Sequence, residues 1–327
     1  MFQIYQKEGT IYIENTPIFN TSIVVDEAFI EGLIGKITFN GSDLLIAIAE
    51  AQHLAYCSRV LSVAVIPLDA NVTCHWHKLK KVNPSERRSS FYDMWQNPTV
   101  QQGVSSATRL LRDTTRLVND MTFDDAITTI CDIFSSHTFY YSNKLDLFDS
   151  QDAFIFNHMM QQSLDATLLP YSVLILQGFV HQEQIVLDDC HCVFTIISRR
   201  SRHRNGLRYQ KRGVDDQGFV ANFVETKQLL CVEMNSHTHQ FQYLQIRGSI
   251  PLYWSQENGM KPVPILGQVK EEVTQRAMTL HFQKIERQYG LCTMINLAEI
   301  DGKEGVLSMA FLDQFHALSK DVTTDKK

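Results

Sequence analysis

A dense basic segment, residues 195–228, limits what this chain can be more than any other part of it. Its sequence, TIISRRSRHRNGLRYQKRGVDDQGFVANFVETKQ, holds eight Lys or Arg residues against three acidic residues, a net charge near +5. The whole chain of 327 residues carries a formal charge of −6, which leaves about −11 for the rest. Such a segment in an acidic protein indicates a surface for anionic groups, with phosphates as the leading candidate. A solvated charged strand and loop is the alternative interpretation.

The composition is that of a soluble globular protein. Hydrophobic residues make up 44% and charged residues 20% of the chain, and the length favours about two domains. Seven cysteines without tight spacing favour reduced thiols and a cytoplasmic location. The N-terminus lacks the pattern of a signal peptide, and the most apolar stretch, 168–180, is too short to span a bilayer. We therefore expect a cytoplasmic protein without a transmembrane segment.

The first half of the chain predicts strands followed by a helix. Apolar residues alternate around a Lys-Glu-Gly turn in residues 2–13, which is typical of a β-hairpin. Two short apolar runs, 44–49 and 60–66, predict buried strands. Thr122 with Asp125 three residues later predicts a capped helix whose apolar residues share one face.

The second half predicts strands and then alternating helix and strand. Segments 168–180 and 192–197 read as strands, 278–289 as a helix ended by a glycine, 291–297 as a buried strand, and 307–318 as a helix. Helix, apolar strand and helix in succession are typical of a parallel α/β sheet. No further strand pattern follows the last helix, so we expect an exposed sheet edge or a protein partner that covers it.

Five short strings between residues 197 and 251 give a more specific indication. They are ISRRS (197–201), RNGLRY (204–209), RGVD (212–215), ANFVET (221–226) and RGSIP (247–251). In this order they resemble the Sac-domain phosphoinositide phosphatases, which include the N-terminal domains of synaptojanins. Weaker matches are FYYS (139–142) before Asp146-Leu147, FIFN (154–157), where a phenylalanine replaces the family's tryptophan, and the glycine pair Gly32 and Gly35.

The resemblance implies an α/β protein in two parts. Residues 1–170 would form an α+β N-terminal subdomain, and residues 171–327 an incomplete α/β phosphatase subdomain. It also implies dephosphorylation of phosphoinositides, such as phosphatidylinositol 4-phosphate, at anionic membrane surfaces. The protein would be peripheral on those membranes.

Family members hydrolyse phosphate monoesters with a Cys-x5-Arg-Thr loop that lies beyond the RGSIP string. A loop of backbone N–H groups at a helix N-terminus lowers the cysteine pKa and holds the phosphate oxygens, and the arginine binds the equatorial oxygens. The sixth residue after each of the seven cysteines is Val, Lys, His, Ile, Ser, His or Ala. The sequence therefore predicts a chain that stops before the nucleophile and is inactive by the cysteine mechanism. The alternative is a non-catalytic module that binds phosphoinositides or a protein.

The resemblance assigns the basic segment to the surface that faces the inositol phosphate headgroup. The candidate substrate-binding residues are Arg200, Arg202, Arg208, Arg212, Asn222, Glu225, Arg247 and Ser249. Strand alternation predicts Arg200 and Arg202 on one face and Arg199 on the other. We hypothesise that Glu225 orients a nearby arginine and that Arg247 helps to position the cysteine loop.

Other patterns carry less weight. Cys74-x-x-His77 and Cys190-His191-Cys192 would suit zinc, but their separation favours buried cysteines. Asp215-Asp216 predicts a turn before Gly218 rather than a cation site. A second basic cluster in 78–90 predicts a loop, or a surface that faces an anionic membrane. The basic segment has few interleaved aromatic residues, which argues against nucleic acid. We therefore expect no cofactor, metal or nucleic-acid partner.

Overall fold

The computed structural model describes residues 2–7, 10–14, 27–54, 57–68, 122–142, 152–188, 190–206, 211–234, 237–256, 263–300 and 302–324. The chain divides into two compact units. The first comprises Met1–Arg199 with Lys227–Tyr243, and the second Arg200–Thr226 with Leu244–Lys327. The subdomain boundary at residue 170 stays a prediction from the family resemblance. The basic cluster in 78–90 and the Cys74–His77 pattern lie outside the described residues.

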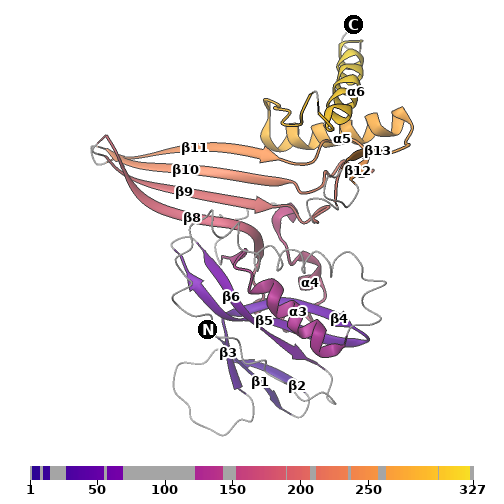
Figure 1. The fold of residues 1–327 in the computed structure, drawn as a ribbon. Helices are drawn as coiled ribbons and strands as arrows, with labels where there is room; N and C mark the ends of the chain where they lie inside the picture. Colours follow the sequence, from indigo (N-terminus) through magenta and orange to yellow (C-terminus); the bar gives the residue numbers. More distant parts are fainter. Residues whose placement is uncertain are drawn as a thin grey trace. The chain divides into compact units, whose positions relative to one another are not determined.

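Strands are the most frequent regular elements of the described structure (Figure 1). They are β1 (Phe2–Lys7), β2 (Thr10–Glu14), β3 (Glu27–Ile30), β4 (Gly32–Phe39), β5 (Ser42–His53), β6 (Ser58–Pro67), β7 (Phe139–Tyr141), β8 (Ile175–Leu187), β9 (Cys190–Arg200), β10 (Val224–Met234), β11 (His237–Arg247), β12 (Trp254–Gln256) and β13 (Pro264–Leu266). The helices are α3 (Phe123–Phe134), α4 (His158–Gln162), α5 (Glu271–Tyr289) and α6 (Gly305–Thr324), with 3-10 turns η4 (Asp152–Phe154) and η5 (Leu169–Tyr171). In this described part, every helix is too short or too polar to span a bilayer.

The largest sheet contains eight strands in the order β11-β10-β9-β8-β7-β6-β5-β4. Neighbouring strands from β4 to β9 pair in antiparallel fashion. The expected strands 44–49 and 60–66 lie within β5 and β6, and 192–197 lies within β9, so these predictions are confirmed. The N-terminal hairpin is confirmed as well, because β1 pairs with β2. The fold is thus mixed α/β, as expected.

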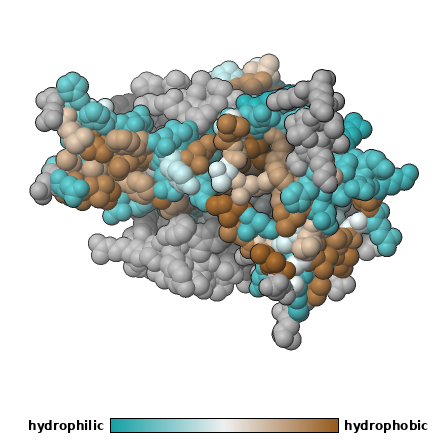
Figure 2. Space-filling view, turned by 90° about the horizontal axis from the view of Figure 1, so that it is seen from above, coloured by the Kyte–Doolittle hydropathy of each residue, from teal (hydrophilic) through white to brown (hydrophobic). Residues whose placement is uncertain are grey.

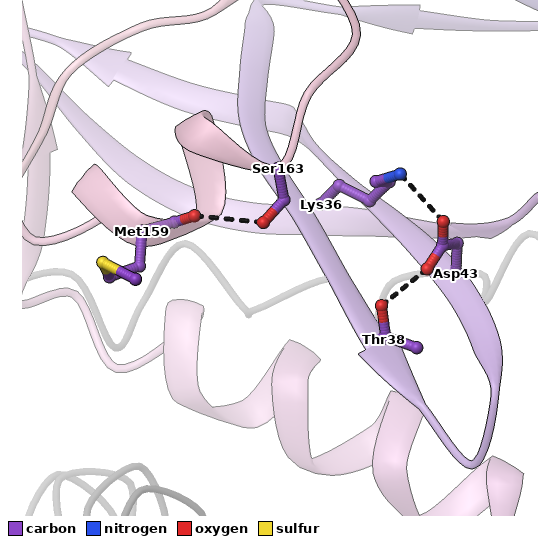
Figure 3. A network of polar contacts seen from close by, with 5 residues as sticks. All are labelled: Lys36, Thr38, Asp43, Met159 and Ser163. Atoms are coloured by element: carbon purple, nitrogen blue, oxygen red, sulfur yellow. Dashed lines mark hydrogen bonds and ion pairs between the residues drawn. The ribbon is translucent and has the colours of Figure 1, made fainter.

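The β4–β5 hairpin shows how local sequence sets a turn. Asn40 and Gly41 both adopt positive φ, 48° and 84°, which matches the type I′ turns that join antiparallel strands. Beyond the turn, Asp43 accepts hydrogen bonds from Lys36 Nζ at 2.8 Å and from Thr38 Oγ1 at 2.6 Å (Figure 3). The lysine and threonine bonds lower the pKa of Asp43. In the same figure, Ser163 Oγ donates to the carbonyl oxygen of Met159 and closes the end of α4.

Helix α3 covers the central strands of the first unit. Thr122 and Asp125 form the predicted capping box, with Asp125 N donating to Thr122 Oγ1 at 3.2 Å. The apolar face of the helix packs against β4, β5, β6 and β7 in one buried cluster that includes Ile127, Ile130 and Phe134. Burial of this face supplies most of the driving force that holds the helix on the sheet.

The structure explains why two of the weaker family matches contain an asparagine and a glycine. Asn157 is fully buried, and its side chain donates to the carbonyl oxygens of Ile34 and Val173 and accepts from Ile175 N. This amide therefore ties β4 to the start of β8. A side chain at Gly35 would meet the backbone of Met160 at 2.6 Å, so only glycine fits at that crossing.

Two predicted strands differ in the structure. The segment 168–180 starts as the 3-10 turn η5, which contains Pro170, and becomes strand β8 only at Ile175. The buried strand predicted at 291–297 is wrong: this segment is irregular, and Leu291 and Leu297 are 99% and 89% exposed. Without it, the predicted parallel helix–strand–helix arrangement is also wrong.

Helices α5 and α6 of the second unit instead share a core without an intervening strand. Leu252, Met278 and Phe311 are buried together, and Phe282, Phe315 and Leu318 pack around them. The helical stripes predicted for 278–289 and 307–318 are therefore confirmed. Gly290 follows α5 with φ of 75°, which agrees with the predicted glycine stop.

Candidate functional site

The basic segment forms the end of β9, a loop and the start of β10. Residues 200–226 of the second unit are called the basic loop below. Arg199, the last residue of the first unit's segment, is 1% exposed and its guanidinium lies 4.5 Å from the centre of the Phe154 ring. Strand β9 ends at Arg200, so the prediction that Arg200 and Arg202 share one strand face is wrong. Arg202 lies in the bend that follows.

Asn222 organises the basic loop. Its Oδ1 accepts hydrogen bonds from Arg200 Nη2 and from Gly206 N, and its Nδ2 donates to the Lys211 carbonyl oxygen at 3.3 Å. Arg200 Nη2 also donates to the Gly206 carbonyl oxygen at 2.5 Å. Arg200 and Gly206 belong to two of the five family strings and Asn222 to a third, so three strings are joined at this amide.

Two further arginines hold backbone and side-chain groups within the second unit. Arg204 Nη2 donates to the Arg212 carbonyl oxygen at 2.7 Å. Arg212 in turn donates from Nε and Nη2 to Gln256 Oε1 at 2.9 and 2.6 Å, and its guanidinium stacks 5.1 Å from the Trp254 ring centre. These arginines fasten the basic loop to the chain around β12.

Ser249 joins the last family string to the basic loop. Its Oγ accepts from Gly213 N at 2.8 Å, and its own N–H donates to the Ala221 carbonyl oxygen at 3.0 Å. Gly213 has φ of 70°, and a side chain there would lie 2.4 Å from the Leu252 carbonyl oxygen. Glycine is therefore required for this close approach.

Two guanidinium groups of the site influence each other. Burial and, to a smaller extent, the nearby positive charge of Arg247 together lower the pKa of Arg200 to about 10. Arg200 is thus still charged at neutral pH. Arg247 is exposed, whereas Arg202 is half-buried. Arg208 lies outside the described residues.

Glu225 is almost fully buried, at 1% exposed, and Tyr289 OH donates to its Oε2 at 2.7 Å. Tyr289 is the last residue of α5. The described bond therefore links the end of the basic loop to that helix. The hypothesis that Glu225 orients an arginine stays a prediction.

The turn predicted at Asp215-Asp216, called the Asp turn below, is present. It is contacted by residues that the sequence did not indicate. Asp215 Oδ1 accepts from Gln217 N and Phe219 N, as in an Asx turn. The Phe219 ring stacks on His203 with centres 3.9 Å apart, and Lys284 Nζ of α5 lies 3.3 Å from its centre. The only sequence signal for the lysine is its position three residues after His281 on one helix face.

His281 is the other helix residue at this turn. Its Nδ1 lies 3.1 Å from the Gly218 carbonyl oxygen, so Nδ1 carries the proton that is donated. Burial lowers the pKa of His281 to about 4. A neutral imidazole therefore fastens α5 to the turn.

The described residues offer no constellation of three or more His, Cys, Asp or Glu side chains that would hold a metal ion. Cys190 and Cys192 are free thiols, and Cys192 Sγ donates to the Cys190 carbonyl oxygen. Burial raises the pKa of Cys57 and Cys131 to about 11, which keeps these thiols protonated and poor as nucleophiles. Guanidinium groups that are held in place, as those of Arg200 and Arg212 are, can donate hydrogen bonds to anionic groups.

Comparisons with known proteins show the family to which the chain belongs. Residues 31–327 match the family described as the SacI homology domain. Phosphatidylinositide phosphatase SAC2 of Danio rerio is 34% identical over 227 residues, which cover 55% of this chain and 20% of the relative. Phosphatidylinositol-3-phosphatase SAC1 of Saccharomyces cerevisiae is 31% identical over 208 residues, 56% of this chain and 33% of the relative.

A longer match is with Phosphoinositide phosphatase SAC3 of Arabidopsis thaliana, 26% identical over 313 residues. That match covers 90% of this chain and 35% of the relative. The chain thus spans about a fifth to a third of the length of these relatives. Since the family match covers most of the sequence, the chain belongs to the SacI homology domain family.

Proposed function

We propose that this chain is the part of a phosphoinositide phosphatase that supplies the basic surface facing the inositol phosphate headgroup. This surface, called the basic wall below, comprises Arg200, Arg202, Arg208, Arg212, Arg247 and Ser249. The observation that carries the proposal is the set of bonds at Asn222, which draws Arg200, Gly206 and Lys211 together. These bonds fix the Arg200 guanidinium and the backbone at Gly206 and Lys211, and a cation that is already fixed loses less entropy when an anionic group binds. The names of the similar proteins, all phosphatases of phosphoinositides, support the same substrate class.

The proposed wall divides its work between two sets of residues. Arg200, Arg212 and Ser249 donate or accept bonds inside the second unit and hold the shape of the loop. Arg247 is exposed beside Arg200 and would contact phosphate. Arg202 and Arg208 are proposed as further contacts. The protein would act at anionic membrane surfaces, on which it would be peripheral.

Phosphate transfer by the family's cysteine mechanism would need a Cys-x5-Arg loop. No cysteine in these 327 residues begins such a loop. We therefore assign binding and positioning of the headgroup, and no nucleophile, to the residues described above.

Phosphate release from short-chain phosphatidylinositol 4-phosphate tests the proposal. The purified 327-residue chain is compared with the product of the complete reading frame. Release by the complete product alone would support a phosphatase in which this chain supplies the wall. Release by the 327-residue chain would overturn the assignment of no nucleophile. If neither product releases phosphate but the chain binds the lipid, a non-catalytic phosphoinositide-binding module is the better description.

Binding to vesicles that contain phosphatidylinositol 4-phosphate tests the wall itself. Arg247→Ala is expected to weaken binding about fivefold, since one basic residue near an anionic surface contributes about 1 kcal/mol. Arg276→Ala, which removes an exposed charge from α5 of the same unit, is the matched control. Its vesicle affinity is expected to stay closer to that of the parent than the affinity of Arg247→Ala does. Unchanged binding and stability of Arg247→Ala would remove that residue from the proposed site.

A further inference from the structure

Strand β11 ends the described eight-stranded sheet and is unusually open. It follows β10 at the end of the strand order, so among the described strands none pairs with its outer edge. All residues from His237 to Tyr243 are exposed, including Phe241 at 56% and Tyr243 at 61%. Its sequence, HTHQFQYLQIR, contains no proline, lysine or acidic residue. Natural sheets usually protect their edges with proline, lysine or other charged residues.

The opposite edge of the same sheet is closed by the chain itself. At β4, Val173 N donates to the Leu33 carbonyl oxygen at 2.9 Å, and Asn157 Nδ2 donates to the Ile34 carbonyl oxygen at 2.6 Å. The first four residues of β4 are buried. One edge of the sheet is therefore protected by side-chain and backbone bonds, while the described structure leaves the other open.

The end of the β8–β11 ribbon has a mixed surface. Figure 2 shows brown and teal residues intermingled over this end, on the left of the view. Strand β8 pairs with β7 over Ile175–Gln177. The rest of β8 carries the exposed acidic residue Glu183, and Asp188 follows the strand. A charged residue within a strand disfavours edge pairing. Strand β11 has a single formal charge, Arg247 at its end, so it is the better candidate for pairing.

We propose that β11 pairs with β11 of a second copy of this chain, antiparallel and centred on Gln242. In this register each Phe241 lies opposite Tyr243 of the second copy, on one face of the joined sheet. Two aromatic cross-strand pairs then flank the symmetry axis, a favoured combination in antiparallel sheets. Gln242 meets its own equivalent on the other face. The strand is thus complementary to itself, as a two-fold interface requires.

The charges on the strand agree with this pairing. Arg247 lies opposite His237 of the second copy, so no two formal charges of one sign are aligned when histidine is neutral. The two sheets would join into one continuous sheet, and each Phe241 ring would contact the Tyr243 ring opposite it. A second copy is the proposed occupant because the aromatic pairs and the charges at the strand ends are complementary under a two-fold axis.

Sedimentation velocity over a concentration range tests for the dimer. The 327-residue chain is expected to form a reversible dimer. Phe241→Lys places a charge on the open edge and is expected to raise the dissociation constant at least about tenfold. Gln283→Lys adds the same charge at an exposed position of α5 and is expected to leave it unchanged. A chain that stays monomeric up to about 0.1 mM would overturn the proposal, since weak specific dimers form at that concentration.

Cysteine cross-linking tests the register. Directly opposite residues of an antiparallel pair have Cα atoms about 5 Å apart, within disulfide range. In a Cys292→Ser background, which removes an exposed thiol, Gln242→Cys is expected to give a covalent dimer on mild oxidation. Gln240→Cys would face Leu244 and is expected to give none. Cross-linking at residue 240 but not 242, or larger species alone, would mean a different pairing and would refute this one.

Discussion

At Asn222 the backbone takes a φ of 55°, while the side chain bonds to Arg200, Gly206 and Lys211 earlier in the basic loop. Asparagine tolerates this left-handed conformation better than most residues because its short side chain bonds locally. The same side chain accepts a charge-assisted bond from Arg200, which is stronger than a neutral one. The residue thus meets a backbone demand and an electrostatic demand together.

Substitution of Asn222 separates these two demands. Asn222→Ala is expected to lower the free energy of unfolding by about 2–4 kcal/mol, because it adds backbone strain to the loss of the Arg200 bond. Asn222→Gly removes the same side chain without the strain, so it is expected to cost about 1 kcal/mol less. Urea unfolding measures both. Equal stability of the alanine variant and the parent would show that the amide bonds contribute little.

Among elements, α5 owes its position to polar contacts as well as to its apolar face. Ala277 and Met278 lie on the buried face of α5, while His281 and Lys284 of the same helix contact the Asp turn. Burial lowers the pKa of Lys284. The helix is therefore attached to the basic loop by groups whose protonation matters.

Stability of the second unit is expected to fall in acid because of His281. Its pKa is about 4 in the fold and 6.5 ordinarily, so the unfolded chain binds the proton more tightly. The contribution is complete above pH 6.5 and is lost as the pH falls towards 4, by about 3 kcal/mol. Urea unfolding at several pH values measures this loss.

His281→Gln keeps a donor for the Gly218 carbonyl oxygen without a group that titrates in this range. Its stability is therefore expected to change less between pH 6.5 and 4 than that of the parent. His239→Gln, at an exposed position, is the control and should keep the parent's slope. Identical slopes for His281→Gln and the parent would contradict the buried neutral state.

For the whole molecule, the two compact units contain separate hydrophobic clusters. The first unit has its largest cluster between α3 and the sheet, and the second has Leu252, Met278 and Phe311 at its centre. Loss of packing in one cluster should therefore act mainly on the unit that contains it.

Met278→Ala is expected to destabilise the second unit by about 2–5 kcal/mol, because it leaves a cavity in a fully buried position. Hydrogen exchange is expected to accelerate in peptides from α5 and α6 and to stay unchanged in α3. Met309→Ala, at a position 55% exposed, is the matched control and should change little. Faster exchange in α3 to the same degree would show that the two units unfold together.

Local patterns were sufficient for much of this molecule. The capping box at Thr122, the strands around 44–49 and 60–66, and the stripes of α5 and α6 depend on short-range periodicity and backbone preferences, which a sequence displays directly. The five short strings indicated the family of the chain and the position of the basic loop. These features need no knowledge of distant residues.

Long-range packing decided the rest. Segment 291–297 has the composition of a buried strand, yet it stays exposed because a strand needs a neighbour to receive its backbone hydrogen bonds. Likewise, charge alone did not show that Arg200, Arg204 and Arg212 each donate bonds inside the second unit. Whether a guanidinium group builds a loop or faces solvent depends on which carbonyl and amide oxygens lie within reach, and only the folded chain brings those oxygens into place.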